Sequence, residues 1–146
     1  PHRLRCSRNI SACVGSTAGL GAGMKFLRSI EDENFLETTT KMGARMVANL
    51  WVLAEHHKVI GDVRGLGLFC GAELVSDRAT KEPMDEKLVA QVVAECGAMG
   101  VIIGATNRSI PGFNNTLCFS PALISTEDDI DQICETVGKA LGKVFG

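Results

Sequence analysis

Residues 63–75 read Val-Arg-Gly-Leu-Gly-Leu-Phe-Cys-Gly-Ala-Glu-Leu-Val, and the rest of the chain can be arranged around them. Gly65 and Gly67 flank Leu66, so the backbone can turn there without the steric penalty of a Cβ atom. We therefore predict a short strand, a bend and a long strand. Side chains alternate across a strand, and one face of the long strand is uniformly small or apolar. This predicted core face comprises Leu68, Cys70, Ala72 and Leu74, whereas Phe69, Gly71, Glu73 and Val75 share the other face.

Two helices are expected before this hairpin. Residues 11–31 mix apolar residues with glycines, each of which weakens a helix by about 1 kcal/mol relative to alanine. Asn34, with Glu37 three residues later, has the pattern of a capping box ahead of a long amphipathic helix at residues 35–57. The apolar stripe of the first helix comprises Met24, Phe26, Leu27 and Ile30, and that of the second comprises Leu36, Met42, Met46, Leu50 and Leu53, widened by Val47 and Ala54.

After the hairpin, polar loops alternate with apolar elements. Residues 76–83 are polar and predict an exposed loop. Residues 85–99 predict a helix that Gly100 ends, and a capping box of Thr126 with Asp129 begins a final helix. Residues 101–103 and 116–119 predict short strands, with a loop at residues 104–115 between them. This order of helices and strands indicates an α+β fold, in which a small, mostly antiparallel sheet is flanked by helices.

The composition of the 146 residues limits the classes of function. A formal net charge of −2 provides no basic surface for nucleic acid or anionic lipid. No run approaches the ~20 apolar residues that a membrane span requires. The six cysteines lack a Cys-x-x-Cys pair, which argues against a zinc site or a disulfide framework and favours buried thiols in the reducing cytoplasm. Because the chain begins at Pro1, we expect a truncated or cut chain rather than a targeting sequence.

Few residues indicate a catalytic or ligand-binding role on their own. His56 and His57 close the long helix and are better placed to interact with its terminal carbonyls than to bind a metal. Neither is near a cysteine in the sequence, as a thiol-dependent enzyme would require. The acidic residues 127–129 complement the dipole of the final helix, and the glycines at 19, 21 and 23 favour close packing over a phosphate loop. Arg108 is the only charge in the loop 104–115, and a guanidinium can hold a carboxylate or sulfonate through two parallel hydrogen bonds.

Two strings resemble a known family. Ile-Gly-Asp-Val-Arg-Gly-Leu-Gly-Leu at residues 60–68, continuing through Gly-Ala-Glu-Leu-Val at 71–75, is similar to the small C-terminal domain of class III aminotransferases, which use pyridoxal phosphate. Gly-Val-Ile-Ile at 100–103, Asn-Arg at 107–108 and Leu-Cys-Phe-Ser-Pro-Ala-Leu-Ile at 117–124 resemble that family's last strand pair and its Ser/Pro-containing turn. The resemblance places residues 25–146 in this domain, which belongs to the fold type I transferases. Residues 1–24 form a poorly matched segment, helical in its second half, and His2 receives no role.

The resemblance also implies a function. It implies a homodimer that transfers an amino group from a donor to pyruvate or another 2-oxo acid. In this family a lysine of the large domain forms a Schiff base with the cofactor, and an aspartate of that domain pairs with the pyridine nitrogen. Both lie upstream of the residues matched here, which implies that this chain holds no catalytic residue and binds no cofactor alone.

Substrate binding is the role that the resemblance leaves to this chain. The family's arginine for the substrate carboxylate commonly stands at the position of Gly104, so Arg108, four residues later, is the candidate substrate-binding residue. The insert at residues 107–115 looks most like members that act on ω-amino donors such as taurine or β-alanine. The alternative is a stand-alone α+β module that binds a small molecule or regulates another protein. A natural start codon near residue 1 and binding of an amino acid without cofactor would favour that module.

Overall fold

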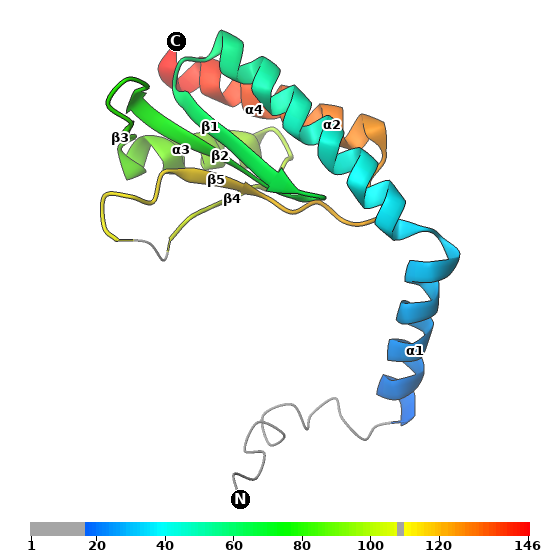
Figure 1. Ribbon diagram of the computed structural model, residues 1–146. Coiled ribbons are helices and arrows are strands. Elements are labelled where there is room, and N and C mark those ends of the chain that lie inside the picture. The colour runs from blue at the N-terminus through cyan, green and yellow to red at the C-terminus, as the bar shows by residue number, and fades with distance from the viewer. Residues whose placement is uncertain (1–16, 108–109) are drawn as a thin grey trace, which may run out of the picture. The chain divides into compact units, whose positions relative to one another are not determined.

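The computed structural model of the chain describes residues 17–107 and 110–146. Contacts between residues divide the chain into two compact units, Pro1–Leu36 and Glu37–Gly146, and the sheet lies in the second unit (Figure 1). No helix within the described ranges is both long enough and apolar enough to cross a membrane. The elements in chain order are α1 Thr17–Asp32, α2 Phe35–His56, β1 Ile60–Leu66, β2 Phe69–Asp77, β3 Glu82–Pro83, α3 Glu86–Ala98, β4 Gly104–Ala105, β5 Thr116–Phe119 and α4 Glu127–Phe145.

The strands form an antiparallel sheet in the order β1-β2-β5-β4, with β3 paired to the end of β2. Figure 1 shows α2 and α4 side by side and α3 behind the strands. The predicted α+β fold with a small antiparallel sheet is therefore confirmed. The bend between β1 and β2 is confirmed as well, because Gly67 has a φ of 54°, in the left-handed region that glycine adopts without strain. All members of the predicted core face are buried, namely Leu68, Cys70, Ala72 and Leu74.

Val75 belongs to the face of β2 opposite the predicted core face, but it is buried as well. The register between β1 and β2 shifts between Ile60 and Asp62, so Gly61 is an additional residue in β1, as in a β-bulge. A Cβ atom on Gly61 would lie 2.7 Å from both methyl carbons of Val75. The absence of a side chain at Gly61 therefore provides the space in which Val75 packs.

The hairpin packs against α2 at a contact between two glycines. A Cβ atom on Gly43 would lie 2.1 Å from the carbonyl oxygen of Gly67, so the helix approaches the turn more closely than any side chain there would allow. On either side of this contact, α2 contributes a stripe of buried residues to the core: Met42, Met46, Leu50 and Ala54. Leu36, which the sequence pattern places in the same stripe, lies at the first turn of α2 and is exposed.

The helix ends follow the predictions with two differences. Thr126 and Asp129 form the predicted capping box of α4, and Gly100, with a φ of 87°, follows α3 as predicted. Residues 11–16 of the first predicted helix lie outside the described residues, and α1 begins at Thr17. Asn34 has a φ of 51° in the junction between α1 and α2, whereas a residue that caps a helix N-terminus is normally extended.

The strand predicted at residues 101–103 is wrong, because the paired residues are Gly104 and Ala105. The amide of Val101 donates to the carbonyl of Cys96 at 3.0 Å, so this segment still belongs to the turn that ends α3. Val101 and Ile103 are nevertheless buried, whereas Ile102 between them is 95% exposed. The predicted loop at residues 76–83 is exposed, but β2 extends into it as far as Asp77 and β3 pairs back onto β2.

Candidate functional site

The loop between β4 and β5 is fixed at its base by hydrogen bonds to the sheet. The amide of Thr106 donates to the carbonyl of Thr116 at 2.9 Å, and the amide of Thr116 donates to Thr106 Oγ1 at 3.3 Å. Asn115 is buried, and its side-chain amide donates to the carbonyl of Leu74 at 2.5 Å. Arg108, the candidate substrate-binding residue, lies in this loop but outside the described residues. The described parts of the loop thus define where it enters and leaves the sheet.

Glu86 holds the second half of this loop from the first turn of α3. Its Oε1 accepts hydrogen bonds from the amide of Gly112 at 2.7 Å, from the amide of Asn114 at 3.3 Å and from the side-chain Nδ2 of Asn114 at 3.0 Å. The hydrogen bonds from Gly112 and Asn114 lower the pKa of the Glu86 carboxyl, because they stabilise its charged form. No local sequence pattern identifies this role of Glu86, because its partners are 26 and 28 residues away.

Anchoring of the loop by Glu86 is expected to depend on pH. Because the pKa of Glu86 is lowered in the folded protein, the anchoring is fully present above its ordinary value of 4.5 and is lost as the pH falls through the lowered value. We expect the protection of the Gly112 amide against hydrogen exchange, taken relative to its intrinsic rate at each pH, to fall several-fold over that range. Glu86→Gln should abolish the pH dependence of this protection while it retains a weaker acceptor, and Glu86→Ala should give low protection at every pH. The same exchange profile in Glu86→Ala as in the parent, with Glu55→Ala as an exposed control, would contradict this role.

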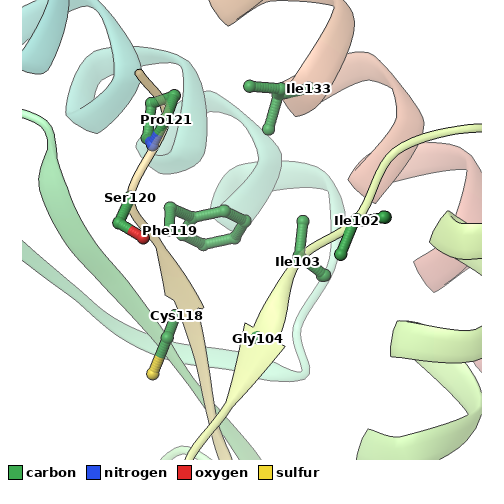
Figure 2. A pocket seen from close by; sticks show the side chains of 8 residues that line it. All are labelled: Ile102, Ile103, Gly104, Cys118, Phe119, Ser120, Pro121 and Ile133. Carbon is green, nitrogen blue, oxygen red and sulfur yellow. The ribbon is translucent and has the colours of Figure 1, made fainter. Parts of the chain in front are cut away.

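A small cavity lies beside the start of the loop, between β4, β5 and α4. Its volume is about 100 Å³, and Gly104, Phe119, Ser120 and Ile133 are among the residues that line it. Figure 2 shows Phe119 and Ile103 directed toward each other, with Ile133 opposite them and Cys118 pointing away. No residue of this lining carries a charge, so the cavity can accept a small apolar group or water but cannot hold a carboxylate by charge. A substrate anion in this region would need a cation from outside this lining.

Arg64 lies on the face of the sheet opposite the core and is held by two carboxylates. Its Nη1 lies 2.6 Å from Asp62 Oδ2 and 2.8 Å from Glu73 Oε2. Hydrogen bonds to Glu73 and Asp62 raise the pKa of Arg64. Asp62 lies on the same strand as Arg64 and Glu73 on the neighbouring strand, and these two carboxylates neutralise the charge of the guanidinium. Arg64 is therefore a poorer anchor for a substrate anion than an unpaired arginine would be.

The acidic residues at the start of α4 form ion pairs with basic side chains of α2. Glu127 accepts hydrogen bonds from Lys41 at 2.6 Å and from Arg45 at 2.9 Å, both on α2. Arg45 also makes two hydrogen bonds to Asp131, at 2.6 and 2.8 Å, and these raise the pKa of Arg45. No group of potential metal ligands occurs in the part of the chain that the structure describes. These acids therefore join α4 to α2, in addition to complementing the helix dipole.

The C-terminus of α2 is capped mainly by Arg78, which the sequence analysis did not single out. The guanidinium of Arg78 donates to the carbonyls of Ala54, His57 and Lys58. Burial and the neighbouring His56 lower the pKa of His57, so its imidazole is less readily protonated than a free histidine. Arg78 thus performs the interaction that the sequence pattern assigned to the imidazolium ions.

Three of the four described cysteines are unsuited to thiol chemistry. Cys70, Cys96 and Cys134 are buried, and burial raises the pKa of each thiol, to about 12 for Cys134. A reactive cysteine requires the opposite, namely a lowered pKa and access to solvent. Cys118 is half-buried. Cys6 and Cys13, like His2, lie outside the described residues.

Comparison with known proteins identifies the family. The family model described as "Aminotransferase class-III" matches residues 14–141. The chain belongs to the class-III aminotransferases. This aminotransferase chain is 64% identical over 138 residues to a hypotaurine/taurine–pyruvate aminotransferase of Paracoccus denitrificans, and 60% identical over 137 residues to a taurine–pyruvate aminotransferase of Rhodobacter capsulatus. Each match covers 94% of this chain but only 30% of the relative, so the chain spans less than a third of the length of these relatives.

Solved structures of aminotransferases share the fold. An aminotransferase of Bacillus anthracis superposes with a TM-score of 0.85 and 36% identity, over 88% of this chain and 29% of that chain. An amine transaminase from an uncultivated Pseudomonas species, in its PLP-bound form, superposes with a TM-score of 0.77 and 27% identity, over 86% of this chain and 27% of that one. The resemblance to a class III aminotransferase is therefore confirmed, and the fold corresponds to one part of these longer solved chains.

The described residues do not fit the attachment site of pyridoxal phosphate. A lysine that forms a Schiff base needs a lowered pKa, which burial or a neighbouring cation provides. Every described lysine is exposed, namely Lys25, Lys41, Lys58, Lys81, Lys87, Lys139 and Lys143. Three of them form ion pairs with glutamates, namely Lys41 with Glu127, Lys139 with Glu135 and Lys143 with Glu95. No step of amino transfer is therefore assigned to these lysines.

Proposed function

We propose that this chain is the C-terminal part of a pyridoxal-phosphate-dependent aminotransferase that moves an amino group from an ω-amino donor, such as taurine or β-alanine, to pyruvate or another 2-oxo acid. The observation that carries the proposal is the 64% identity with a hypotaurine/taurine–pyruvate aminotransferase over nearly the whole chain. The match extends through the loop between β4 and β5, which the resemblance links to ω-amino donors. The amino donor and the acceptor are thus proposed from the relatives and from the loop together.

The role proposed for this chain is to bind the substrate rather than to perform the chemistry. Arg108 holds the carboxylate or sulfonate of the donor through paired hydrogen bonds, which a guanidinium makes with either anion. The cofactor, when bound to the whole enzyme, accepts and returns the amino group, and the residues that hold it belong to the large domain upstream. The whole protein is a homodimer of the cytoplasm, and the chain alone is inactive.

The test is an assay of the full-length protein with pyruvate as acceptor. We expect alanine to form with taurine or β-alanine as donor, and none to form without a donor. Alanine formation only with donors that carry neither a sulfonate nor a carboxylate would contradict the proposed substrate class.

The isolated chain provides a second test of the proposal. Visible absorption spectra with added pyridoxal phosphate, before and after borohydride, should show no stoichiometric covalent adduct. Such an adduct, followed by turnover of an amine, would overturn the assignment of the chemistry to the upstream part. Binding of an amino acid by the isolated chain without cofactor would instead favour a stand-alone module.

A further inference from the structure

The loop between β4 and β5 is attached to a helix as well as to the sheet. A single oxygen of Glu86, at the start of α3, accepts three hydrogen bonds from the returning half of the loop, at 2.7, 3.0 and 3.3 Å. The donors are the amide of Gly112 and both the amide and the side chain of Asn114. The next residue, Asn115, is buried and donates to the carbonyl of Leu74 in β2. Two consecutive residues therefore attach the loop to two different elements.

A groove beside α3 brings both halves of the loop to the same place. Its volume is about 430 Å³, and it is lined by Asn107 and Asn114, one from each half of the loop, and by Glu86 and Ala90 of α3. Glu86 and Ala90 are four residues apart, so they share one face of the helix. Residues 108–111 connect the two halves, and a chain so short can reach only a small region beyond its attached ends. The position of that connection therefore depends on the contacts of Glu86.

We infer that Glu86 is a positioning residue that determines which length of amino donor the enzyme prefers. The inference rests on the proposed function, in which the loop between β4 and β5 binds the anion of the donor and the upstream part of the enzyme holds the cofactor. The donor is then held at its amine and at its anion, so its length must match the distance between these two places. A donor of matching length binds to the loop as Glu86 holds it, and this preorganisation favours its affinity. A longer donor requires the loop to shift and to lose hydrogen bonds to Glu86.

Loss of these hydrogen bonds should affect donors of different length unequally. In Glu86→Ala the loop must be ordered when the donor binds, so the KM for taurine and β-alanine should rise. We expect a rise of roughly tenfold, since a misplacement of about 1 Å in a binding site can cost a hundredfold. The kcat should change little, because the anion lies away from the reacting amine. The longer donors 4-aminobutanoate and 5-aminopentanoate should lose less, because the released loop can shift toward them. The ratio of kcat/KM between short and long donors should therefore fall several-fold.

Two conservative variants separate this positioning role from an effect of charge. If Glu86 acted only by repelling anionic donors, Glu86→Ala and Glu86→Gln would lower the KM for every anionic donor equally, and Glu86→Asp would resemble the parent enzyme. Positioning predicts a different order. Glu86→Gln keeps an oxygen acceptor at the same distance from the backbone, so it should restore most of the preference for short donors. Glu86→Asp keeps the charge but is one methylene shorter, so it should lose the preference as Glu86→Ala does.

Steady-state kinetics of the full-length protein with pyruvate and these donors test the inference. Glu55→Ala, which removes an exposed glutamate from α2, is the matched control and should keep the parent's preference. Circular dichroism and cofactor absorbance establish that each variant is folded and loaded. If Glu86→Ala does not fold, the order of Glu86→Gln and Glu86→Asp decides the question.

The outcomes also distinguish this inference from the proposed function. A parent enzyme that forms no alanine from any anionic donor would contradict the proposed function. An active parent whose donor preference is unchanged in Glu86→Ala, or is lost in Glu86→Gln but kept in Glu86→Asp, would overturn only the role of Glu86. A parent that uses short and long donors equally well would overturn it too, because no preference would then exist for Glu86 to determine.

Discussion

Gly43→Ala is expected to lower the free energy of unfolding of this chain by at least about 2 kcal/mol. The added Cβ atom would lie 2.1 Å from the carbonyl oxygen of Gly67, so α2 and the hairpin would have to separate. Overpacking of this kind costs typically 1–3 kcal/mol and sometimes more, and here the opposing atom is backbone that cannot rotate away. The gain in helix propensity from Gly to Ala is about 1 kcal/mol and has the opposite sign. The steric cost is therefore larger than the gain in helix propensity, and the net effect is destabilising.

Urea unfolding of the purified chain, followed by circular dichroism, measures this difference. Gly97→Ala is the matched control, because Gly97 also lies in a helix and a Cβ atom there would meet nothing within 4 Å. The control should therefore be neutral or stabilising, by up to about 1 kcal/mol. Equal stability of the two variants would contradict the close packing of α2 on the hairpin.

Elements with a strict hydrophobic periodicity could be predicted from the sequence, whereas irregularities of the backbone could not. The alternation of Leu68, Cys70, Ala72 and Leu74 predicted the core face of β2, because period two alone defines a strand's faces. The burial of Val75 was not predicted. Gly61, at a bulge in β1, leaves the space in which Val75 packs, and a bulge depends on strand pairing that the sequence of a single strand does not reveal. Residues 101–103 are apolar enough for a strand, but the hydrogen bond of Val101 to Cys96 keeps them in the turn after α3.

The site was less predictable, because its contacts join residues far apart in the chain. Arg78 caps α2 through the carbonyl of Ala54, 24 residues earlier, and Glu86 anchors the amide of Gly112, 26 residues later. Neither residue forms a local motif with its partners, so only the folded structure brings them together. The capping box of Thr126 and Asp129 was predictable for the opposite reason, since its partners are three residues apart.

Arg108→Ala in the full-length enzyme is expected to raise the KM for taurine and other anionic donors by about tenfold to a hundredfold. Each hydrogen bond to a charged group contributes roughly 1.5–3 kcal/mol, and loss of a paired interaction would remove at least one such contribution. In the proposed function the arginine binds the donor anion away from the reacting amine, so its loss would weaken binding of the ground state and of the transition state alike. Therefore kcat should change little, and the effect should appear in KM. Cofactor absorbance should remain that of the parent enzyme.

Arg108→Lys separates charge from geometry in the same assay. A lysine keeps the positive charge but cannot make two parallel hydrogen bonds with a sulfonate, so its KM should lie between those of the parent and Arg108→Ala. Lys58→Ala removes an exposed charge from the junction of α2 and β1 and serves as the control, with unchanged KM expected. An amine donor without an anionic group should show no dependence on residue 108, because the guanidinium then has no partner. Kinetics of Arg108→Ala indistinguishable from those of the control with taurine would remove Arg108 from the site and return the search for the substrate cation to the upstream part of the enzyme.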